Sequence, residues 1–523
     1  MTRAKKSFFN WITGVGASVL TLLLSFITRA VFIDALGNSY LGIEGLFTNI
    51  LSFLSLAELG FGSAIVFKLY KPLEEDDRPR LRALMRLYRR TYAVIGCVIT
   101  VLGLCLIPLL PALIKDYDTL ARLHLNGVVI FLIYLFNSAS SYWFFAYKTS
   151  FVQAAQKSYV LNILGYGIKI ASSLCQIAVL LATGDFIVYL LVQIGFVILG
   201  NLVYAIVCDR QYPYLREKTG DRVPRQELRE FFKDCSALFL FQAATVVVNA
   251  SDNIVLSALL GLEAVGIYFK YTSVKTALLG LLYNFFSGVR ASVGSLYTTG
   301  NLDWSRLIFR TVNLCTSILF GITAVGMGVL LNDFIALWLG PEHVLTVWTA
   351  GGKAVPSPLA LLIAVELYIT GRAYCYGTFR SSMGLFREMW FRPLVNMVVN
   401  LAVSICTVPR LGPAGCVLGT IISYLVSNLL FDPIIICGKV LKISVARYFL
   451  SCLLQDGLTA AAGLVCWRLC RLIPLGGVPG FVVRGVICVA VTGGMFTVGF
   501  WRTGEFRFLV STARSLLPGR RAS

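Results

Sequence analysis

The sequence predicts an all-α polytopic membrane protein of about 14 transmembrane helices, with two pseudo-symmetric six-helix lobes and two additional C-terminal helices. Three observations predict this fold. Of the 523 residues, 57% are hydrophobic and only 14% are charged, and the mean hydropathy is +0.78. Apolar runs of about 20 residues, the length that crosses a bilayer, recur along the whole chain. A short glycine-containing motif is found twice, six runs apart.

The apolar runs account for the predicted helices in order. They cover residues 10–33, 41–67, 92–113, 126–147, 159–182, 186–208, 237–258, 265–288, 307–331, 359–379, 391–408, 414–437, 449–467 and 480–500. The first run is longer than the core of a cleavable signal peptide, which is about 7–15 residues. We therefore expect it to remain in the protein as the first membrane helix.

The distribution of positive charge predicts the orientation of the helices. When the N-terminus is placed inside, most of the 46 lysines and arginines fall in inside segments, as the positive-inside rule requires. The segments expected outside hold only Lys115, Arg122, Lys353, Arg410, Arg468, Arg471 and Arg484. Both termini are therefore expected in the cytoplasm, with the chain in a bacterial cytoplasmic (plasma) membrane. Topology and anionic lipid explain the net charge of +20, so no nucleic-acid partner is expected.

An internal repeat predicts the domain organisation. LGNSYLGI at residues 36–43 matches LGLEAVGI at residues 260–267, in the shared pattern LG-x3-[LV]-G-I. Six predicted spans separate the copies, so the two halves should share one orientation. The predicted division is an N-terminal six-helix lobe at 1–208, a cytoplasmic linker at 209–230, a C-terminal six-helix lobe at 231–437, two additional helices at 438–501 and a basic cytoplasmic tail at 502–523. Within the tail, Gly504–Leu517 is interpreted as an interfacial helix or a disordered basic segment.

Charged residues inside apolar runs are the candidate functional residues. The cations are Arg29, Lys169, Lys270, Lys275 and Arg372, and the carboxylates are Glu58, Asp252 and Glu366. Because a charge at the centre of a membrane helix costs about 2.5–3.5 kcal/mol, such residues usually face a bundle interior or a wet cavity. The cations predict a cavity for an anionic cargo, unless each one snorkels or pairs structurally. The carboxylates serve ion coupling or, as the favoured interpretation, act as partners of the cations.

The cysteines and histidines indicate no metal site. The chain has 14 cysteines, most of them within apolar runs, and no C-x-x-C spacing. It has two histidines, His124 and His343, both in predicted outer connections. No zinc site, disulfide framework or cofactor is therefore expected.

Several segments resemble one family of transporters. The stretch around Arg29–Tyr70 (TRAVFIDALGNSYLGIEGLF and onward), the turn LGLEAVGIY, and RLGPAGCVLGT at Arg410–Thr420 resemble bacterial polysaccharide (oligosaccharide) flippases. These belong to the multidrug/oligosaccharidyl-lipid/polysaccharide exporter superfamily. The resemblance implies two six-helix lobes in a V, alternating access and a lipid-linked sugar as cargo. It also implies that Arg29 matches a cavity arginine of the related lipid II flippases, and that Phe449–Phe500 forms a groove for a lipid tail.

The expected function is therefore a flippase, not an enzyme. It would move a polyprenyl-diphosphate oligosaccharide across the membrane for cell-surface polysaccharide synthesis, with central cations holding the pyrophosphate. Expected partners are this lipid-linked oligosaccharide, membrane lipids and polysaccharide assembly proteins, and the protein is expected to be a monomer. A cation-coupled multidrug exporter of the same superfamily is one alternative. A membrane glycosyltransferase or polymerase is another, but it would need a large outer domain or an acidic metal site. A major-facilitator transporter is disfavoured because Lys71–Arg78 lacks the expected glycine- and aspartate-containing signature.

Overall fold

A computed structural model gives the arrangement of the chain. It describes residues 3–55, 61–114, 120, 123, 125–145, 147–155, 158–217, 223–224, 243, 246–248, 250–297, 302–348, 354–383, 385, 389 and 391–516. These residues are almost entirely helical, which confirms the predicted all-α class. The chain forms two compact units, Met1–Gly266 and Ile267–Ser523. This division falls inside a helix, and the domain boundaries predicted from the sequence stay a prediction.

The first unit consists of helices that begin at clear sequence signals. They are α1 (Arg3–Leu36), α2 (Asn38–Leu54), α3 (Phe61–Glu74), α4 (Arg78–Leu106), η2 (Ile107–Leu109), α5 (Leu110–Leu113), α7 (Gly127–Trp143), α8 (Tyr147–Ala154), α9 (Ser158–Thr183), α10 (Phe186–Gln211) and η3 (Pro213–Arg216). Asp77, Asn126 and Asp185 cap α4, α7 and α10, because each side chain accepts hydrogen bonds from backbone N–H groups of the first helical turn.

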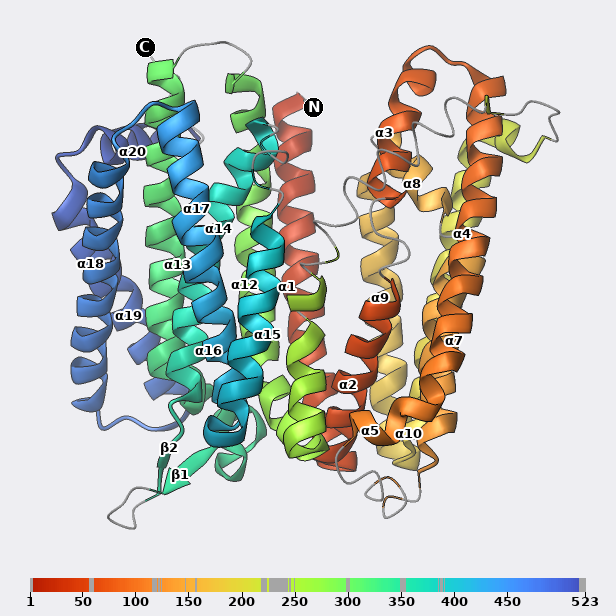
Figure 1. Cartoon of the computed structure of the whole chain (residues 1–523), viewed down its shortest axis with the longest axis horizontal. Coiled ribbons are helices and arrows are strands. Elements are labelled where there is room, and N and C mark those ends of the chain that lie inside the picture. The colour runs from red at the N-terminus through yellow and green to blue at the C-terminus, as the bar shows by residue number, and fades with distance from the viewer. Residues whose placement is uncertain are drawn as a thin grey trace. The chain divides into compact units, whose positions relative to one another are not determined.

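The second unit contains the remaining helices and one small hairpin. Its elements are α12 (Leu262–Tyr297, which begins in the first unit), α13 (Leu302–Leu339), η4 (Pro341–His343), β1 (Thr346–Trp348), β2 (Ala354–Pro356), α14 (Leu359–Met383), α15 (Arg392–Leu411), α16 (Pro413–Tyr424), η5 (Leu425–Leu429), α17 (Leu430–Pro433), η6 (Ile434–Val440), α18 (Val445–Arg471), α19 (Gly477–Phe500) and α20 (Gly504–Leu516). The antiparallel β1–β2 hairpin was not predicted, and it lies at the opposite end of this unit from α20 (Figure 1).

The helices are long and apolar enough for a multi-pass membrane protein. Ten helices among the described residues qualify as membrane spans, or eleven when the bent pair α7–α8 is one span. The predicted count of 14 is not confirmed. Run 41–67 corresponds to two shorter helices, α2 and α3, and run 237–258 lies largely outside the described residues. Run 265–288 lies within α12, which is 36 residues long and is not among the ten.

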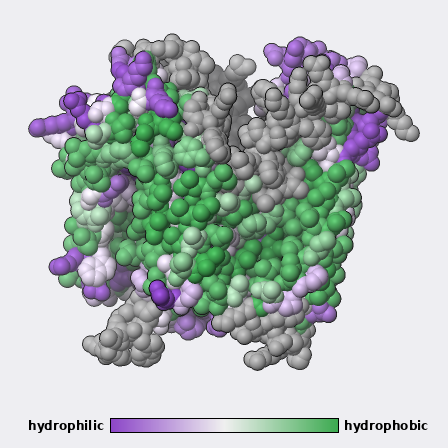
Figure 2. Space-filling view, viewed as in Figure 1, coloured by the Kyte–Doolittle hydropathy of each residue, from purple (hydrophilic) through white to green (hydrophobic). Residues whose placement is uncertain are grey.

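The surface of each unit matches a lipid environment. Hydrophobic residues cover the middle of the visible face and hydrophilic residues lie toward the two ends (Figure 2). Large apolar side chains such as Val94, Leu181 and Leu453 are more than half exposed. In water, exposing so many apolar side chains would be costly, but in hydrocarbon it is favourable because these side chains then avoid water. The helical backbone also suits this environment, since its polar groups are hydrogen-bonded within each helix.

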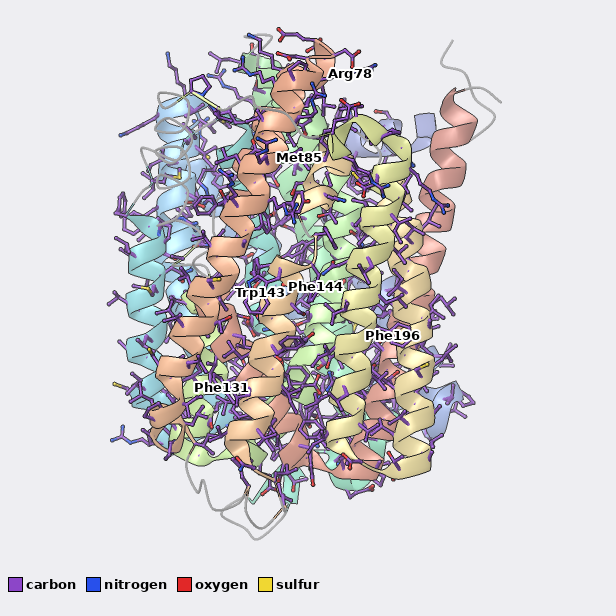
Figure 3. The ribbon with its side chains drawn as sticks, turned by 90° about the vertical axis from the view of Figure 1, so that its right-hand side faces the viewer. Arg78, Met85, Phe131, Trp143, Phe144 and Phe196 are labelled. Atoms are coloured by element: carbon purple, nitrogen blue, oxygen red, sulfur yellow. The ribbon has the colours of Figure 1, made fainter. Side chains whose placement is uncertain are left out.

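Small residues allow close helix packing in the first unit. A Cβ atom added to Gly96 of α4 would lie 2.5 Å from Nε1 of Trp143, so the indole occupies the space that the glycine leaves. Figure 3 shows Trp143 and Phe144 about halfway along the helices of this unit, where α7 ends. Close approach at small residues is a common means of helix association in membranes.

The two copies of the repeated motif have the same backbone geometry. Gly37 has φ 91° and Gly261 has φ 93°, a region that residues with a side chain rarely adopt. Each glycine directly precedes a helix, α2 in the first copy and α12 in the second. The glycine of the LG pair is therefore required by the turn in both copies.

The second glycine of each copy mediates a reciprocal contact. A Cβ atom on Gly42 would lie 2.0 Å from the carbonyl oxygen of Leu262, and one on Gly266 would lie 2.3 Å from the carbonyl oxygen of Asn38. Only glycine permits this approach, because the opposing atoms belong to the backbone and cannot rotate away. The starts of α2 and α12 thus pack backbone to backbone.

Candidate functional site

Arg29 forms an ion pair within the first unit. Its Nη1 and Nη2 atoms donate to Oε2 and Oε1 of Glu44 at 2.7 and 3.2 Å, so the contact is bidentate and joins α1 to α2. The Arg29 side chain is 21% exposed, and its guanidinium lies 5.8 Å from the ring centre of Phe32. The sequence analysis did not single out Glu44. Its position in the apolar run 41–67 was the signal that could have identified it.

Two of the other three candidates in the first unit are among the described residues. Lys169 on α9 is exposed. Asp252 is buried in the short helix Val246–Leu260. Glu58 lies outside the described residues. Of the two predicted cations in this unit, Arg29 is therefore the one that pairs with a carboxylate of the described residues.

Lys275 and Glu366 form a buried ion pair in the second unit. Nζ of Lys275 on α12 lies 2.6 Å from Oε1 of Glu366 on α14, and the two side chains are 12% and 7% exposed. The desolvation of such a pair offsets much of its attraction, but removing one member leaves an uncompensated buried charge. Both residues were predicted from the sequence, Glu366 with a favoured role as partner of a cation, and the fold brings them together across 91 positions of sequence.

Lys270 lies at the end of the same unit, against a histidine. Its side chain is almost fully buried, and its Nζ is 3.4 Å from Nδ1 of His343 in the connection after α13. Burial, and secondly the charge of Lys270, lower the pKa of His343 below its ordinary value of 6.5. The neutral imidazole can then accept a hydrogen bond from the ammonium group.

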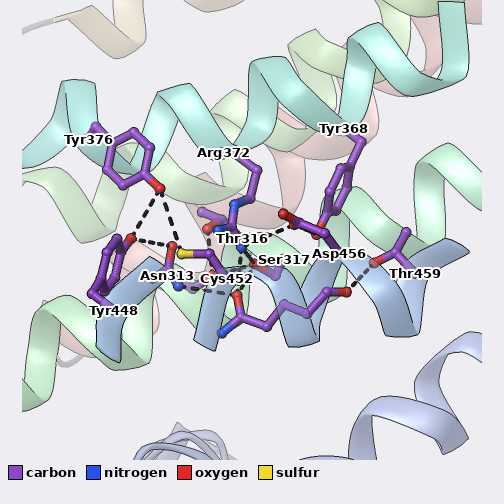
Figure 4. Close-up of polar contacts among 11 residues, drawn as sticks. Asn313, Thr316, Ser317, Tyr368, Arg372, Tyr376, Tyr448, Cys452, Asp456 and Thr459 are labelled. Atoms are coloured by element: carbon purple, nitrogen blue, oxygen red, sulfur yellow. Dashed lines mark hydrogen bonds and ion pairs between the residues drawn. The ribbon is translucent and has the colours of Figure 1, made fainter. Parts of the chain in front are cut away.

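Arg372 is the centre of a buried polar network between α13, α14 and α18 (Figure 4). Its side chain is 2% exposed. Its Nη1 donates to Oγ of Ser317 at 2.7 Å and to Oε1 of Gln455 at 2.6 Å, and it lies 3.7 Å from Oδ1 of Asp456. The guanidinium is therefore held mainly by neutral oxygens, with a more distant and partly exposed carboxylate.

Further hydrogen bonds extend this network along α18. Nδ2 of Asn313 donates to Oε1 of Gln455 at 3.1 Å, and the Tyr448 hydroxyl donates to Oδ1 of Asn313 at 2.9 Å. Tyr368 donates to Asp456 at 2.8 Å. The sequence analysis proposed Arg372 but missed its partners, although adjacent Gln455 and Asp456 interrupt the apolar run 449–467.

A second buried charge cluster was also missed. Asp432 is fully buried, with Oδ2 2.7 Å from Nη1 of Arg380 and Oδ1 3.5 Å from Nε of Arg392. Arg380 directly follows the apolar run 359–379 and Arg392 lies at the start of the run 391–408, so neither was named as a candidate. The π-helical turns η5 and η6 flank the short helix that carries Asp432, and such turns are frequent at functional sites.

The arrangement can hold anions but shows no metal chemistry among the described residues. No group of three or more histidine, cysteine, aspartate or glutamate side chains there could bind a metal ion. The cysteines of the described part of the chain are free thiols. Four of the five predicted cations, Arg29, Lys270, Lys275 and Arg372, are thus largely shielded from solvent and contact a carboxylate or neutral polar groups of their own unit, whereas Lys169 is exposed.

Solved structures of membrane transporters resemble this fold. A lipid II flippase MurJ in an inward closed conformation matches with a TM-score of 0.66 and 15% identity, covering 95% of this chain and 100% of that chain. An inward-facing multidrug resistance MATE family transporter of the MOP superfamily matches with a TM-score of 0.54 and 14% identity, covering 83% and 99%. A point mutant of the Vibrio cholerae MATE transporter VcmN matches with a TM-score of 0.54 and 12% identity, covering 83% and 97%.

Sequence comparison identifies the family. None of the curated proteins compared with the chain matches it. The family model described as "Polysaccharide biosynthesis protein" matches residues 8–291, which is more than half of the chain. Together with the flippase and transporter folds above, this match confirms the resemblance noted in the sequence. The chain therefore belongs to the polysaccharide biosynthesis protein family of polytopic membrane proteins.

Proposed function

We propose that the protein is a flippase for a polyprenyl-diphosphate-linked oligosaccharide in the cytoplasmic membrane of a bacterium, with both termini in the cytoplasm. The observation that carries this proposal is the set of buried cations in apolar helices, above all Lys275 paired with Glu366. Membership of a polysaccharide biosynthesis family and the similarity in fold to a lipid II flippase support it. The lipid-linked oligosaccharide, membrane lipids and polysaccharide assembly proteins would be its partners.

In the proposed mechanism, a cation pairs with its carboxylate when no cargo is bound and with the pyrophosphate when cargo is bound. A pyrophosphate loses its hydration in a low-dielectric cavity, and charge-assisted hydrogen bonds from lysine or arginine can replace it. Without cargo, Glu366 neutralises Lys275 and keeps the buried ammonium stable. When the cargo enters, its pyrophosphate competes for the ammonium, and relative movement of the two lobes then exposes the cargo to the other side. Arg29, Lys169, Lys270 and Arg372 are proposed to contribute further positive charge.

An apolar groove supports a lipid-linked cargo. Helices α18 and α19 form a groove of about 460 Å³ whose lining is almost entirely apolar and includes Leu458, Gly494 and Val498. Two glycines among the lining residues, Gly494 and Gly499, keep it open. A hydrocarbon chain fits such a groove without loss of hydrogen bonds.

A multidrug exporter is the second candidate, because MATE transporters share the fold. A site for organic cations needs a carboxylate that can face the cargo. Glu366 and Asp252 are buried carboxylates in apolar helices. Because Glu366 binds Lys275, a cationic cargo would have to displace the lysine and an anionic cargo the glutamate. The charged residues predicted within apolar runs are five cations against three carboxylates, and this excess favours the anionic cargo. An enzyme acting on lipid-linked sugars is disfavoured because the solved structures of similar fold are described as a flippase and as transporters.

The test reconstitutes purified protein in vesicles with a fluorescent polyprenyl-diphosphate oligosaccharide and measures its movement between leaflets by quencher access. Lys275→Gln should reduce transport at least about tenfold, since it removes a charge-assisted contact of roughly 1.5–3 kcal/mol. Lys71→Gln is the matched control, because it removes the same charge from a side chain that is 81% exposed.

A charge reversal separates a role in cargo binding from a role in folding. Exchanging the two residues (Lys275→Glu with Glu366→Lys) restores an ion pair but moves the cation from α12 to α14. If Lys275 binds cargo, this double variant should fold like the wild type and remain inactive. Full recovery of transport, or transport of a cationic dye in place of the oligosaccharide, would contradict the proposal.

A further inference from the structure

A basic cavity in the second unit is lined by none of the residues used above for cargo binding. It has a volume of about 540 Å³ and is formed by α13, the connection from η6 to α18, and the ends of α18, α19 and α20 that meet there. Four of its lining residues are cations, Arg306, Arg310, Lys442 and Arg447, and one is a carboxylate, Glu505. The volume is within the range of about 300–1,000 Å³ that is typical of small-molecule sites.

The wall that carries Lys442 is held in place by Arg306. Nε of Arg306 donates to the carbonyl oxygen of Leu441 at 2.8 Å, and Nη2 donates to that of Lys442 at 3.3 Å. Lys442 has φ 52°, which is uncommon for a residue with a side chain. Arg447 follows in the first turn of α18, whose N-cap is Ser444. These contacts define the positions of two cations at one rim of the cavity.

Helix α20 forms the opposite wall. Oε1 of Glu505 lies 3.6 Å from Nη1 of Arg310, and Phe508 packs edge to face against Trp304 of α13, with ring centres 5.3 Å apart. The Glu505 side chain is 24% exposed and the Arg310 side chain is 50% exposed. Glu505 thus contacts Arg310, and Asp303, which is outside the lining, pairs with Arg306 at 2.8 Å, so the excess positive charge of the cavity comes from Lys442 and Arg447.

The floor of the cavity consists of buried neutral groups. Asn313, Tyr448 and Gln455 line it and are hydrogen-bonded to one another. Through Oε1 of Gln455 the floor is also joined to Arg372. Surface cations that only attract loosely held counter-ions would not need buried polar groups beneath them. The cavity thus has the depth and the polar surroundings of a built site.

The position of the cavity indicates where its ligand comes from. It lies where α13 and α18 begin and α19 ends, which is where membrane helices leave the hydrocarbon core. Lipid headgroups occupy this depth, and clustered lysines and arginines there attract anionic ones. We propose that this cavity binds a phosphate group, carried by the headgroup of an anionic membrane phospholipid. The proposal does not depend on the cargo of the transporter.

The test measures lipid binding to delipidated protein in a neutral detergent by native mass spectrometry. Lys442→Gln with Arg447→Gln should weaken phosphatidylglycerol binding about tenfold or more, since two cations beside one phosphate are lost. Glu505→Gln should strengthen it, because a competing anion is removed. Lys439→Gln with Arg502→Gln is the control, since it removes the same charge from exposed residues outside the lining.

The ligands distinguish the source of the phosphate. Phosphatidylglycerol should bind more tightly than dioleoylglycerol, which has no phosphate. Inorganic phosphate is tested by its effect on the thermal unfolding of the same variants. Stabilisation by inorganic phosphate that is lost in the Lys442/Arg447 variant would assign the site to a soluble phosphate. The proposal is overturned if the wild type and that variant respond equally to both ligands, or if the control variant loses as much binding.

Discussion

Replacing Gly42 with alanine is expected to destabilise the protein, although alanine is the better helix former. The new Cβ atom would lie 2.0 Å from the carbonyl oxygen of Leu262 and 2.8 Å from its carbonyl carbon, whereas ordinary contact begins at 3.4 Å. The starts of α2 and α12 would therefore have to separate by roughly 1 Å or more. Overpacking of this kind costs about 1–3 kcal/mol, and the helix propensity of alanine offsets about 1 kcal/mol of it.

The assay is thermal unfolding of the purified protein in detergent, followed by tryptophan fluorescence. Gly195→Ala in α10 is the matched control, because no atom lies within 4 Å of the added Cβ. It should leave the unfolding temperature unchanged or raise it slightly, whereas Gly42→Ala should lower it.

The reciprocal glycine gives a second, independent check. Gly266→Ala should also destabilise, since its Cβ would lie 2.3 Å from the carbonyl oxygen of Asn38 and 3.4 Å from the backbone nitrogen of Gly42. Because both substitutions push apart the same two helix starts, the double variant should lose less stability than the sum of the single losses. Equal unfolding temperatures for Gly42→Ala and Gly195→Ala would refute the backbone-to-backbone contact.

Two further predictions concern buried charge. The pKa of His343 in the folded protein lies below 6.5. The stability that the neutral imidazole contributes is therefore complete above pH 6.5 and is lost as the pH falls through the folded-state pKa. The loss occurs because the protonated imidazolium then lies beside the positive charge of Lys270. His343→Gln should therefore flatten the dependence of the unfolding temperature on pH between pH 7 and 5. Asp432→Asn leaves Arg380 and Arg392 buried without their carboxylate and should cost about 3–5 kcal/mol, measured by denaturant or thermal unfolding.

The control for Asp432→Asn is the loss of an exposed carboxylate. Asp303→Asn removes a carboxylate that is 89% exposed and pairs with Arg306, so it should cost less than about 1 kcal/mol. A comparable loss at Asp303 and Asp432 would show that burial does not govern the effect. For the histidine, an unchanged pH dependence in the His343→Gln variant would place the titrating group elsewhere.

The sequence predicted most of the helices because their signals are local. An apolar run of about 20 residues predicts a membrane helix wherever it lies, and polar residues such as Asp77 and Asp185 mark helix starts by bonding their own first turn. The two elements that the sequence did not predict correctly also depend on local sequence. The run 41–67 looks continuous, yet α2 ends at Leu54 and α3 begins at Phe61. The β1–β2 hairpin has strands of three residues each, too short for a clear pattern.

The candidate cations and the carboxylate Glu366 were visible because a charge in an apolar run is conspicuous, but the sequence did not show which residue each cation meets. Glu44 lies 15 positions from Arg29, Glu366 lies 91 positions from Lys275, and Gln455 lies 83 positions from Arg372. No spacing rule connects residues on different helices, so such pairs cannot be read from periodicity.

A helical membrane protein with a repeated glycine turn can thus be predicted from sequence alone, because the length of an apolar run and the φ angles open to glycine depend only on neighbouring residues. The packing of the helices is needed to show which carboxylate or amide contacts each buried cation, and that the basic residues near the starts of α13 and α18 line one cavity with α20. The reason is physical: a buried charge is stabilised by whatever polar group the packing of distant helices brings within a few ångströms.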